Sequence, residues 1–164
     1  MTSTQDFEVE IDIGIRTSKI GDTDAIFEIE KSVFSQFLQY GYSIILGLIT
    51  ISAPHLALTA YLEDSKQIIG FIAGEVDEKD SSLGRLITIE IDPKFQNHHI
   101  GSKLLSKFEE NISSHYLVQK IDLQVHSSNK IAISFYEKHN YQKIKELRNY
   151  YARREHAILM RKKC

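Results

Sequence analysis

The sequence predicts an α/β fold, a mixed sheet flanked by helices, from three observations. Segments with the two-residue period of strands alternate with segments of helical period along the chain. The chain has 164 residues, 42% of them hydrophobic and 26% charged, as in ordinary globular domains. No internal repeat, low-complexity tract or linker divides it, so residues 1–164 are expected to form one domain.

The first half of the chain is expected to contain one strand, two helices and a β-hairpin. Apolar and polar residues alternate over Val9–Arg16, which predicts a half-buried strand. Asp22 or Thr23 can cap the helix that follows. The remaining elements are a helix over Tyr42–Ile51 and the two hairpin strands Leu56–Leu62 and Gln67–Val76.

The second half continues with alternating strands and helices. Asp92-Pro93 ends a strand over Arg85–Ile91, and an amphipathic helix begins near His99 or Ile100. The elements after it are a strand over Lys120–His126, a helix that starts at Ser127-Ser128-Asn129 and ends at His139-Asn140, and strands over Tyr141–Leu147 and His156–Arg161. The predicted order is therefore βααβββαβαββ.

Charge and cysteine content exclude several classes of function. The formal net charge is −2, and the chain therefore has no basic footprint for nucleic acid or for a membrane surface. The single cysteine, Cys164, cannot form an internal disulfide, and no Cys/His spacing predicts a metal site. The N-terminus lacks the pattern of a signal peptide. We expect a cytoplasmic protein without a metal.

The loop Gln96–Ser102 has features of a phosphate-binding site. It connects a strand to an amphipathic helix, and a helix N-terminus offers unpaired N–H groups and partial positive charge. Gly101 would allow a ligand to approach the backbone, and Ser102 and Lys103 add a donor and a charge.

The chain from Ile91 to Leu105 resembles the GNAT acetyltransferase superfamily. Ile91-Asp92-Pro93-Lys94-Phe95 is similar to the end of that family's central strand, V-x-P-x-[YF], and Gln96–Ser102 is similar to its [QR]-x-x-G-x-[GA] loop. His99 replaces a usual glycine, which is tolerable if its backbone is already helical. The resemblance implies a mostly antiparallel sheet and a site for acetyl-coenzyme A. The residues implied to bind it here are Ile89, Ile91, Gln96, Asn97, His98, His99, Ile100, Gly101 and Ser102.

A second motif of the family is matched from Leu123 to Tyr141. Asn129, Ala132, Tyr136 and Tyr141 stand at its positions, and Asn140 replaces the usual glycine. The resemblance implies that Asn129 binds the pantetheine arm and that Tyr136 protonates the departing thiolate. A tyrosine of pKa ~10 can donate a proton or hydrogen bond to a thiolate whose conjugate acid has a pKa of about 8.5. Phe135 is expected to pack in the core against the coenzyme.

The chain is most similar to the branch that acetylates protein N-termini, including the ribosomal-protein-alanine acetyltransferases. The similarity covers nearly the whole length, including the segment around Ile29-Glu30 and the ending Asn149-Tyr150-Tyr151. It implies an α-amine as acceptor, with Phe34, Tyr150 and Tyr151 binding the substrate, and allows an auxiliary subunit. Ordinary exposed aromatics in a hairpin loop are the alternative for the two tyrosines.

The general base is the open question. Gln124 and Arg85 stand where this branch has a glutamate and a histidine, and neither is an ordinary base. Glu90, which faces the cleft or carries a partner, and His126 are the nearest titratable residues. An α-amine has a pKa of ~7.7–8.0 against ~10.4 for lysine, so it needs little help to lose its proton. A small amine as acceptor, or a domain that binds acyl-coenzyme A without transfer, remain alternatives.

Overall fold

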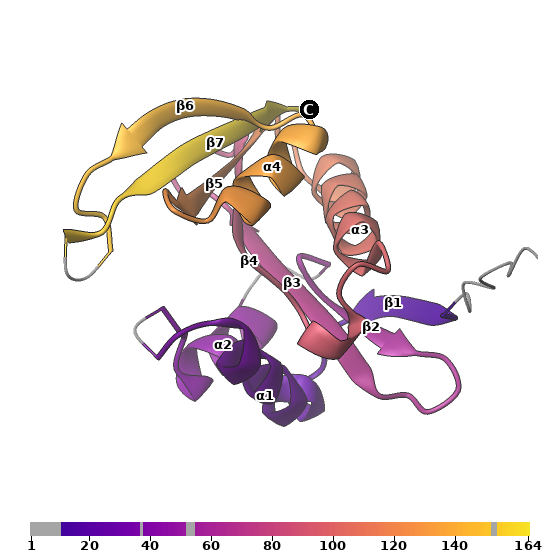
Figure 1. Cartoon of the computed structure of the whole chain (residues 1–164). Helices are drawn as coiled ribbons and strands as arrows, with labels where there is room; N and C mark the ends of the chain where they lie inside the picture. Colours follow the sequence, from indigo (N-terminus) through magenta and orange to yellow (C-terminus); the bar gives the residue numbers. More distant parts are fainter. Residues whose placement is uncertain (1–10, 37, 52–54, 152–153) are drawn as a thin grey trace, which may run out of the picture.

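A single seven-stranded sheet runs through the computed structural model of the chain, in the spatial order β1-β2-β3-β4-β5-β7-β6 (Figure 1). The structure describes residues 11–36, 38–51, 55–151 and 154–164. The strands are β1 (Ile13–Thr17), β2 (Ala57–Leu62), β3 (Ile68–Val76), β4 (Leu83–Ile91), β5 (Lys120–His126), β6 (Gln142–Leu147) and β7 (Ala157–Lys163). The predicted order of elements is confirmed. Residues 9 and 10 of the first predicted strand lie outside the described residues.

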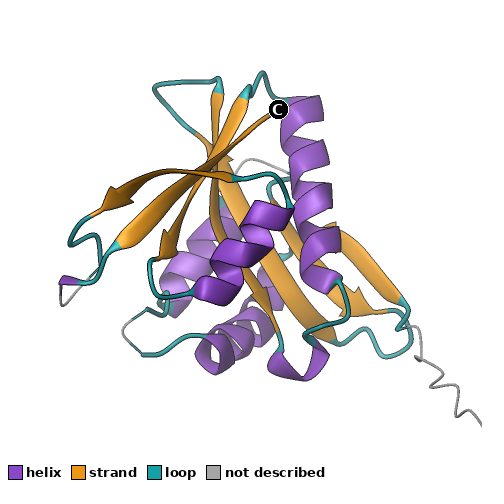
Figure 2. Cartoon of the chain, turned by 45° about the horizontal axis from the view of Figure 1, so that its top comes forward, coloured by secondary structure: helices purple, strands orange, loops and turns teal. Residues whose placement is uncertain are grey.

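Helices cover both faces of the sheet (Figure 2). They are α1 (Thr23–Val33), α2 (Tyr42–Thr50), α3 (Ile100–His115) and α4 (Lys130–Lys138), with short 3₁₀ turns at Ile20–Asp22 and Pro93–Phe95. Buried residues of α1 and α2 pack in one cluster with Phe71 of β3, and those of α3 and α4 pack in the other with its neighbour Ile72. Successive side chains of a strand point to opposite faces, so the two helix pairs lie on opposite sides.

The apolar face predicted for the helix after the loop is confirmed. Its five members are each no more than 2% exposed and form part of the larger core cluster: Ile100, Leu104, Leu105, Phe108 and Ile112. Burying five such side chains contributes about 1.5–3 kcal/mol each, which fixes α3 firmly on the sheet. The start of this helix is therefore a rigid part of the molecule.

Asp22 stands at the N-cap of α1, one of the two positions predicted, but its carboxylate makes no capping hydrogen bond to that helix. It accepts two hydrogen bonds from the Arg16 guanidinium, at 2.6 and 2.9 Å, and one from the backbone N–H of Lys19. The guanidinium offers the carboxylate two charge-assisted hydrogen bonds in place of a capping bond to the helix.

None of the described helices is long and apolar enough to cross a membrane.

Candidate active site

The central feature of the site is the separation of β4 from β5. These two strands run parallel and pair only from Leu83 with Lys120 to Leu86 with Leu123. A bulge on the other side of β4, where Ala73 pairs with Thr88 but Gly74 pairs with Leu86, turns the strand away at this point. Beyond it the two strands diverge (Figure 1). From Ile87 to Ile91, β4 stays paired with β3, but no described strand pairs with its β5-facing edge, which can hydrogen-bond a ligand.

A cavity of about 660 Å³ lies where the strands part. This volume is in the range of small-molecule and cofactor sites. Its walls come from the end of α1 and the loop after it, the middle of β4, the end of β5, the first turns of α4, and the loop between β6 and β7. The residues are Val33, Phe34, Ser35, Leu38, Tyr40, Ile87, Thr88, Ile89, Gln124, Val125, His126, Ser128, Asn129, Ala132, Phe135, Tyr136, Tyr151 and Glu155.

The loop Gln96–Ser102 leads into α3 with two residues in the left-handed region. Asn97 has φ 66° and His99, the N-cap of α3, has φ 58°. The condition under which a histidine would be tolerable here, a backbone that is already helical, is therefore not met at His99. Glycine adopts this conformation more easily than histidine, which fits the glycine that the resembled motif has here. Gln96 ties the loop to β4 by donating from Nε2 to the carbonyl of Ile91 at 3.2 Å.

Residues of the second motif, Leu123–Tyr141, lie at both ends of α4. The Oδ1 of Asn129 accepts the N–H of Ala132 at 3.0 Å and caps the helix, which leaves the N–H donors of the same amide for a ligand. At the other end Asn140 has φ 69°, and the N–H of Tyr141 bonds the carbonyl of Tyr136 at 3.0 Å. This is the left-handed closure predicted for asparagine.

Tyr136 reaches the cavity from the buried side of α4. It is 8% exposed, and its ring packs edge-on against Phe135 and Tyr141 at centroid distances of 5.3 and 5.7 Å. Burial raises the pKa of its hydroxyl well above the ordinary value, with smaller contributions from Tyr151 and Tyr40. The group is therefore a hydrogen-bond donor throughout the neutral range.

His126 sits at the end of β5 between two polar partners. Its Nδ1 accepts from the N–H and the hydroxyl of Ser128, at 3.2 and 2.7 Å, and its Nε2 lies 2.6 Å from a carboxylate oxygen of Glu155. Because the backbone N–H can only donate, Nδ1 is the acceptor and Nε2 carries the proton. The ring also stacks on Tyr151, with 5.4 Å between centroids.

The substrate residues expected from the sequence lie on two sides of the cavity. Phe34 and Tyr151 line it, whereas Tyr150 is half exposed and packs edge-on against Tyr151 at 5.0 Å. Burial, with the nearby Tyr40 and Tyr150, raises the pKa of Tyr151 to about 12.

Glu90 lies outside the cavity. It is 1% exposed on the face of β4 that packs against α1, where its carboxyl meets that of Glu30. Burial and then Glu30 raise the pKa of Glu90 to about 10, so its carboxyl is protonated at neutral pH. A protonated acid cannot take a proton from an amine. The geometry therefore favours the interpretation in which Glu90 has a buried partner over the one in which it acts as the base.

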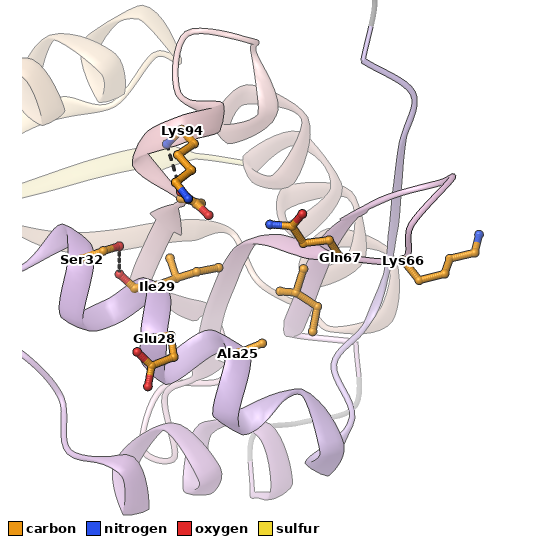
Figure 3. A pocket seen from close by; sticks show the side chains of 9 residues that line it. Ala25, Glu28, Ile29, Ser32, Lys66, Gln67 and Lys94 are labelled. Atoms are coloured by element: carbon orange, nitrogen blue, oxygen red, sulfur yellow. Dashed lines mark hydrogen bonds between the residues drawn. The ribbon is translucent and has the colours of Figure 1, made fainter.

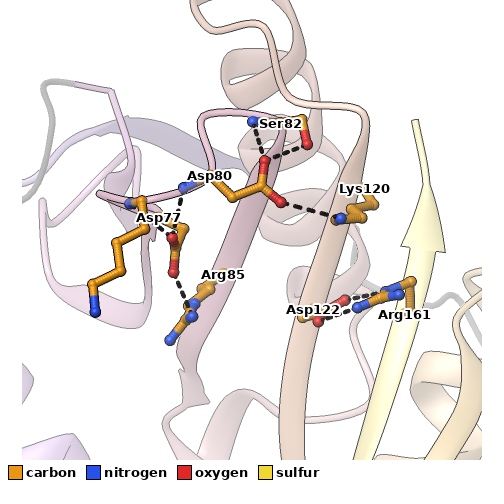
Figure 4. Close-up of polar contacts among 8 residues, drawn as sticks. Asp77, Asp80, Ser82, Arg85, Lys120, Asp122 and Arg161 are labelled. Atoms are coloured by element: carbon orange, nitrogen blue, oxygen red, sulfur yellow. Dashed lines mark hydrogen bonds and ion pairs between the residues drawn. The ribbon is translucent and has the colours of Figure 1, made fainter.

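Of the two residues that replace the branch's usual base, only Gln124 lines the cavity. Arg85 pairs with Asp77 in a series of ion pairs along the still-paired parts of β4, β5 and β7 (Figure 4). The others in the series join Lys120 to Asp80 and Arg161 to Asp122. Arg85 therefore lies where β4 and β5 are still paired, and it does not line the cavity.

A second hollow, of about 560 Å³, lies between α1 and the ends of β3 and β4 (Figure 3). Its charged groups are of both signs, and two of them are already paired, Glu28 with Lys31 and Lys66 with Glu63. The arrangement does not select one kind of ligand. Among the described residues no three histidine, cysteine, aspartate or glutamate side chains come together to hold a metal ion.

Several residues of the cavity were not predicted from the sequence, among them the polar residues Tyr40, Thr88, Ser128 and Glu155. Ser128 could have been found, because it follows His126 by two residues beside the Asn129 of the motif. The others reach the site only through the packing of distant elements.

Comparison with known proteins identifies the family and the relatives of this chain. The Acetyltransferase (GNAT) family matches residues 23–141. An N-alpha-acetyltransferase of Sulfolobus acidocaldarius is 25% identical over 98% of both chains. The crystal structure of Ard1 from Thermoplasma volcanium superposes with a TM-score of 0.83 at 22% identity, covering 92% of this chain and 97% of that one. Naa50 of Arabidopsis thaliana, in complex with the bisubstrate analogue CoA-Ac-MVNAL, gives a TM-score of 0.77 at 20% identity over 93% and 99%. Other similar proteins belong to the N-terminal acetyltransferase B and C complexes.

Proposed function

Because this chain belongs to the acetyltransferase (GNAT) family, we propose that it acetylates the α-amine at the N-terminus of a protein or peptide. It is an N-acetyltransferase, and acetyl-coenzyme A is its acetyl donor. The observation that carries the proposed acceptor is the similarity over nearly the whole chain to a protein named N-alpha-acetyltransferase. The position of the two tyrosines is compatible with it, because Tyr151 lines the cavity and Tyr150, packed against it, is half exposed.

The described residues fit acetyl-coenzyme A along one path. The first N–H groups of α3 can hold the pyrophosphate, and the unpaired edge of β4 together with the Asn129 amide can bond the pantetheine arm. Acetyl-coenzyme A supplies a thioester whose acetyl carbon an amine attacks. Ile89, Asn129, Phe135 and Tyr136 all line the cavity in which this thioester would lie.

Gly101 offers a test of this placement that separates binding from folding. A Cβ at Gly101 would meet Phe135 at 3.5 Å, an ordinary contact, so Gly101→Ala should fold with unchanged or slightly greater stability. A methyl group on the first turn of α3 would nevertheless obstruct a pyrophosphate. We expect acetyl-coenzyme A to bind about tenfold more weakly by calorimetry. Unchanged affinity would place the pyrophosphate elsewhere.

Tyr136 acts in this proposal as a hydrogen-bond donor to the leaving sulfur. Its hydroxyl has a pKa above 10, whereas an ordinary thiol has a pKa of about 8.5, so complete proton transfer to a thiolate is uphill by about 2 kcal/mol or more. A hydrogen bond that strengthens as negative charge develops on the sulfur lowers the barrier without that cost.

The acceptor loses its proton with modest help. About a tenth of an α-amine of pKa ~8 is already neutral at pH 7. We propose that His126 completes the transfer through Ser128: the Ser128 hydroxyl takes the amine proton as its own passes to Nδ1. Glu155 accepts the Nε2–H and holds the ring in that tautomer.

A panel of acceptors tests the function. With acetyl-coenzyme A as donor, short peptides with free α-amines should be acetylated at least about tenfold more efficiently than free lysine or spermidine. The quantity to compare is kcat/KM for each acceptor at pH 8. A preference for spermidine or an amino acid would favour the small-amine alternative, and no transfer to any acceptor despite coenzyme binding would favour the binding module. A cytoplasmic location and an auxiliary subunit remain predictions.

A further inference from the structure

Two carboxyl groups meet in the interior between α1 and β4. Glu30, in the third turn of α1, is fully buried, and Glu90 of β4 is 1% exposed. The Oε2 atom of each is buried and has no hydrogen-bond partner among the described residues, and the two carboxyl groups lie within interaction distance of each other. Two such groups can lie in contact only if they share a proton, because two buried charges of the same sign repel strongly.

The other oxygen of each carboxyl bonds a residue of the cavity wall. Oε1 of Glu30 accepts the backbone N–H of Tyr40 at 2.5 Å, and Oε1 of Glu90 accepts the hydroxyl of Thr88 at 2.8 Å. Tyr40 belongs to the loop between α1 and α2, and Thr88 to β4, and both line the cavity. The Glu30–Glu90 pair therefore connects two walls of the cavity, the α1–α2 loop and β4, from a position outside the cavity itself.

The loop between α1 and α2, which the Glu30–Glu90 pair holds, lies near Tyr136 and Tyr151. Phe34 follows Glu30 by one turn, and its carbonyl accepts a hydrogen bond from Gln39 Nε2 at 2.7 Å, which closes the loop up to Tyr40. Tyr40 lies near enough to Tyr136 and Tyr151 to raise the pKa of both hydroxyls. Described residues of this loop therefore line the cavity near both tyrosines, where the proposed acceptor would enter.

We propose that Glu30 and Glu90 are positioning residues for the acceptor: their shared proton fastens the α1–α2 loop to β4 and sets the width of the acceptor end of the cavity. This rests on the proposed function in placing the acceptor between Tyr40 and Tyr151. Apolar residues would pack this interior at lower cost in desolvation, and a fixed distance between the two walls is what the polar pair adds.

The test compares two substitutions at one position. Glu90→Ala removes the link, and it should raise the KM of the acceptor by about tenfold or more while the KM of acetyl-coenzyme A changes by less than about twofold. Glu90→Gln supplies an amide N–H where the wild type has the acid proton, and it should recover the acceptor KM to within about threefold of the wild-type value. Glu109→Ala is the matched control. Its carboxylate pairs with Lys162 at 2.6 Å away from the cavity, so it should lower stability without raising the acceptor KM.

Two outcomes would overturn the inference: Glu90→Gln as impaired as Glu90→Ala, which would require an ionisable carboxyl, or an unchanged acceptor KM in Glu90→Ala. If Glu90→Ala does not fold, Glu90→Gln decides alone, since a base at this position predicts a loss of about a hundredfold in kcat. All variants are assayed with the best acceptor of the wild-type panel. An error in the proposed acceptor then appears in the wild type, whereas an error in this inference appears in the ratios among variants.

Discussion

Replacing Tyr136 by phenylalanine should lower kcat by about a hundredfold or more and leave the affinity for acetyl-coenzyme A within about threefold of the wild-type value. The ring that packs on Phe135 and Tyr141 is retained, so only the hydroxyl is lost. That hydroxyl keeps its proton at neutral pH because burial raises its pKa, and Tyr136 lines the cavity in which we propose that the thioester lies. The measurement is steady-state kinetics together with calorimetric binding of the coenzyme.

Tyr141→Phe is the matched control for this experiment. Tyr141 is 2% exposed, its ring contacts that of Tyr136, and its hydroxyl lies beside Glu109 outside the cavity. Both substitutions remove one buried hydroxyl from neighbouring rings, but only Tyr136→Phe should slow transfer. Equal losses in the two variants would indicate a general packing effect, and a near-normal rate in Tyr136→Phe would remove the donor role.

Local patterns predicted the fold because each can be read within a few residues. The spacing of Ile100, Leu104 and Phe108 requires only a helical period, and these side chains are buried as the pattern indicates. Asn140 closes α4 in the left-handed conformation, which asparagine accepts at little cost. The motif around Asn129 and Tyr136 lies on a single helix, so its side chains reach one cavity.

Contacts between distant segments account for what the sequence did not predict. Glu30 and Glu90 are far apart in the chain and meet only because α1 packs on that face of β4, so the partner of Glu90 had no local signal. The role of Glu155 depends on the β6–β7 loop folding back to the end of β5, where it reaches His126. The left-handed backbone of His99 was missed for another reason: the position favours glycine, and the residue type alone indicated the opposite.

The shared proton of Glu30 and Glu90 should make the stability of the protein fall with pH in a way that Glu90→Gln abolishes. The pKa of Glu90 is about 10 in the folded chain against 4.5 as its ordinary value, so between these pH values the folded state holds a proton that the unfolded state has lost. This contribution to stability is fully present below pH 4.5 and is lost as pH rises towards 10. The slope is about 1.4 kcal/mol of unfolding free energy per pH unit while one extra proton is bound.

Urea unfolding at pH 6, 7 and 8 measures this effect. Titrating groups other than Glu30 and Glu90 are common to both proteins and cancel in the difference. If Glu30 binds no proton in the variant, the unfolding free energy of Glu90→Gln relative to the wild type should increase by about 2.7 kcal/mol between pH 6 and 8. Parallel curves would mean that the folded variant binds as many protons as the folded wild type, either because Glu90 is ionised in the wild type or because Glu30 takes up the proton in the variant. The order of titration also matters for turnover. An α-amine loses its proton near pH ~8, well below the pKa of Glu90, so the acceptor becomes nucleophilic while the pair still holds the two walls of the cavity together.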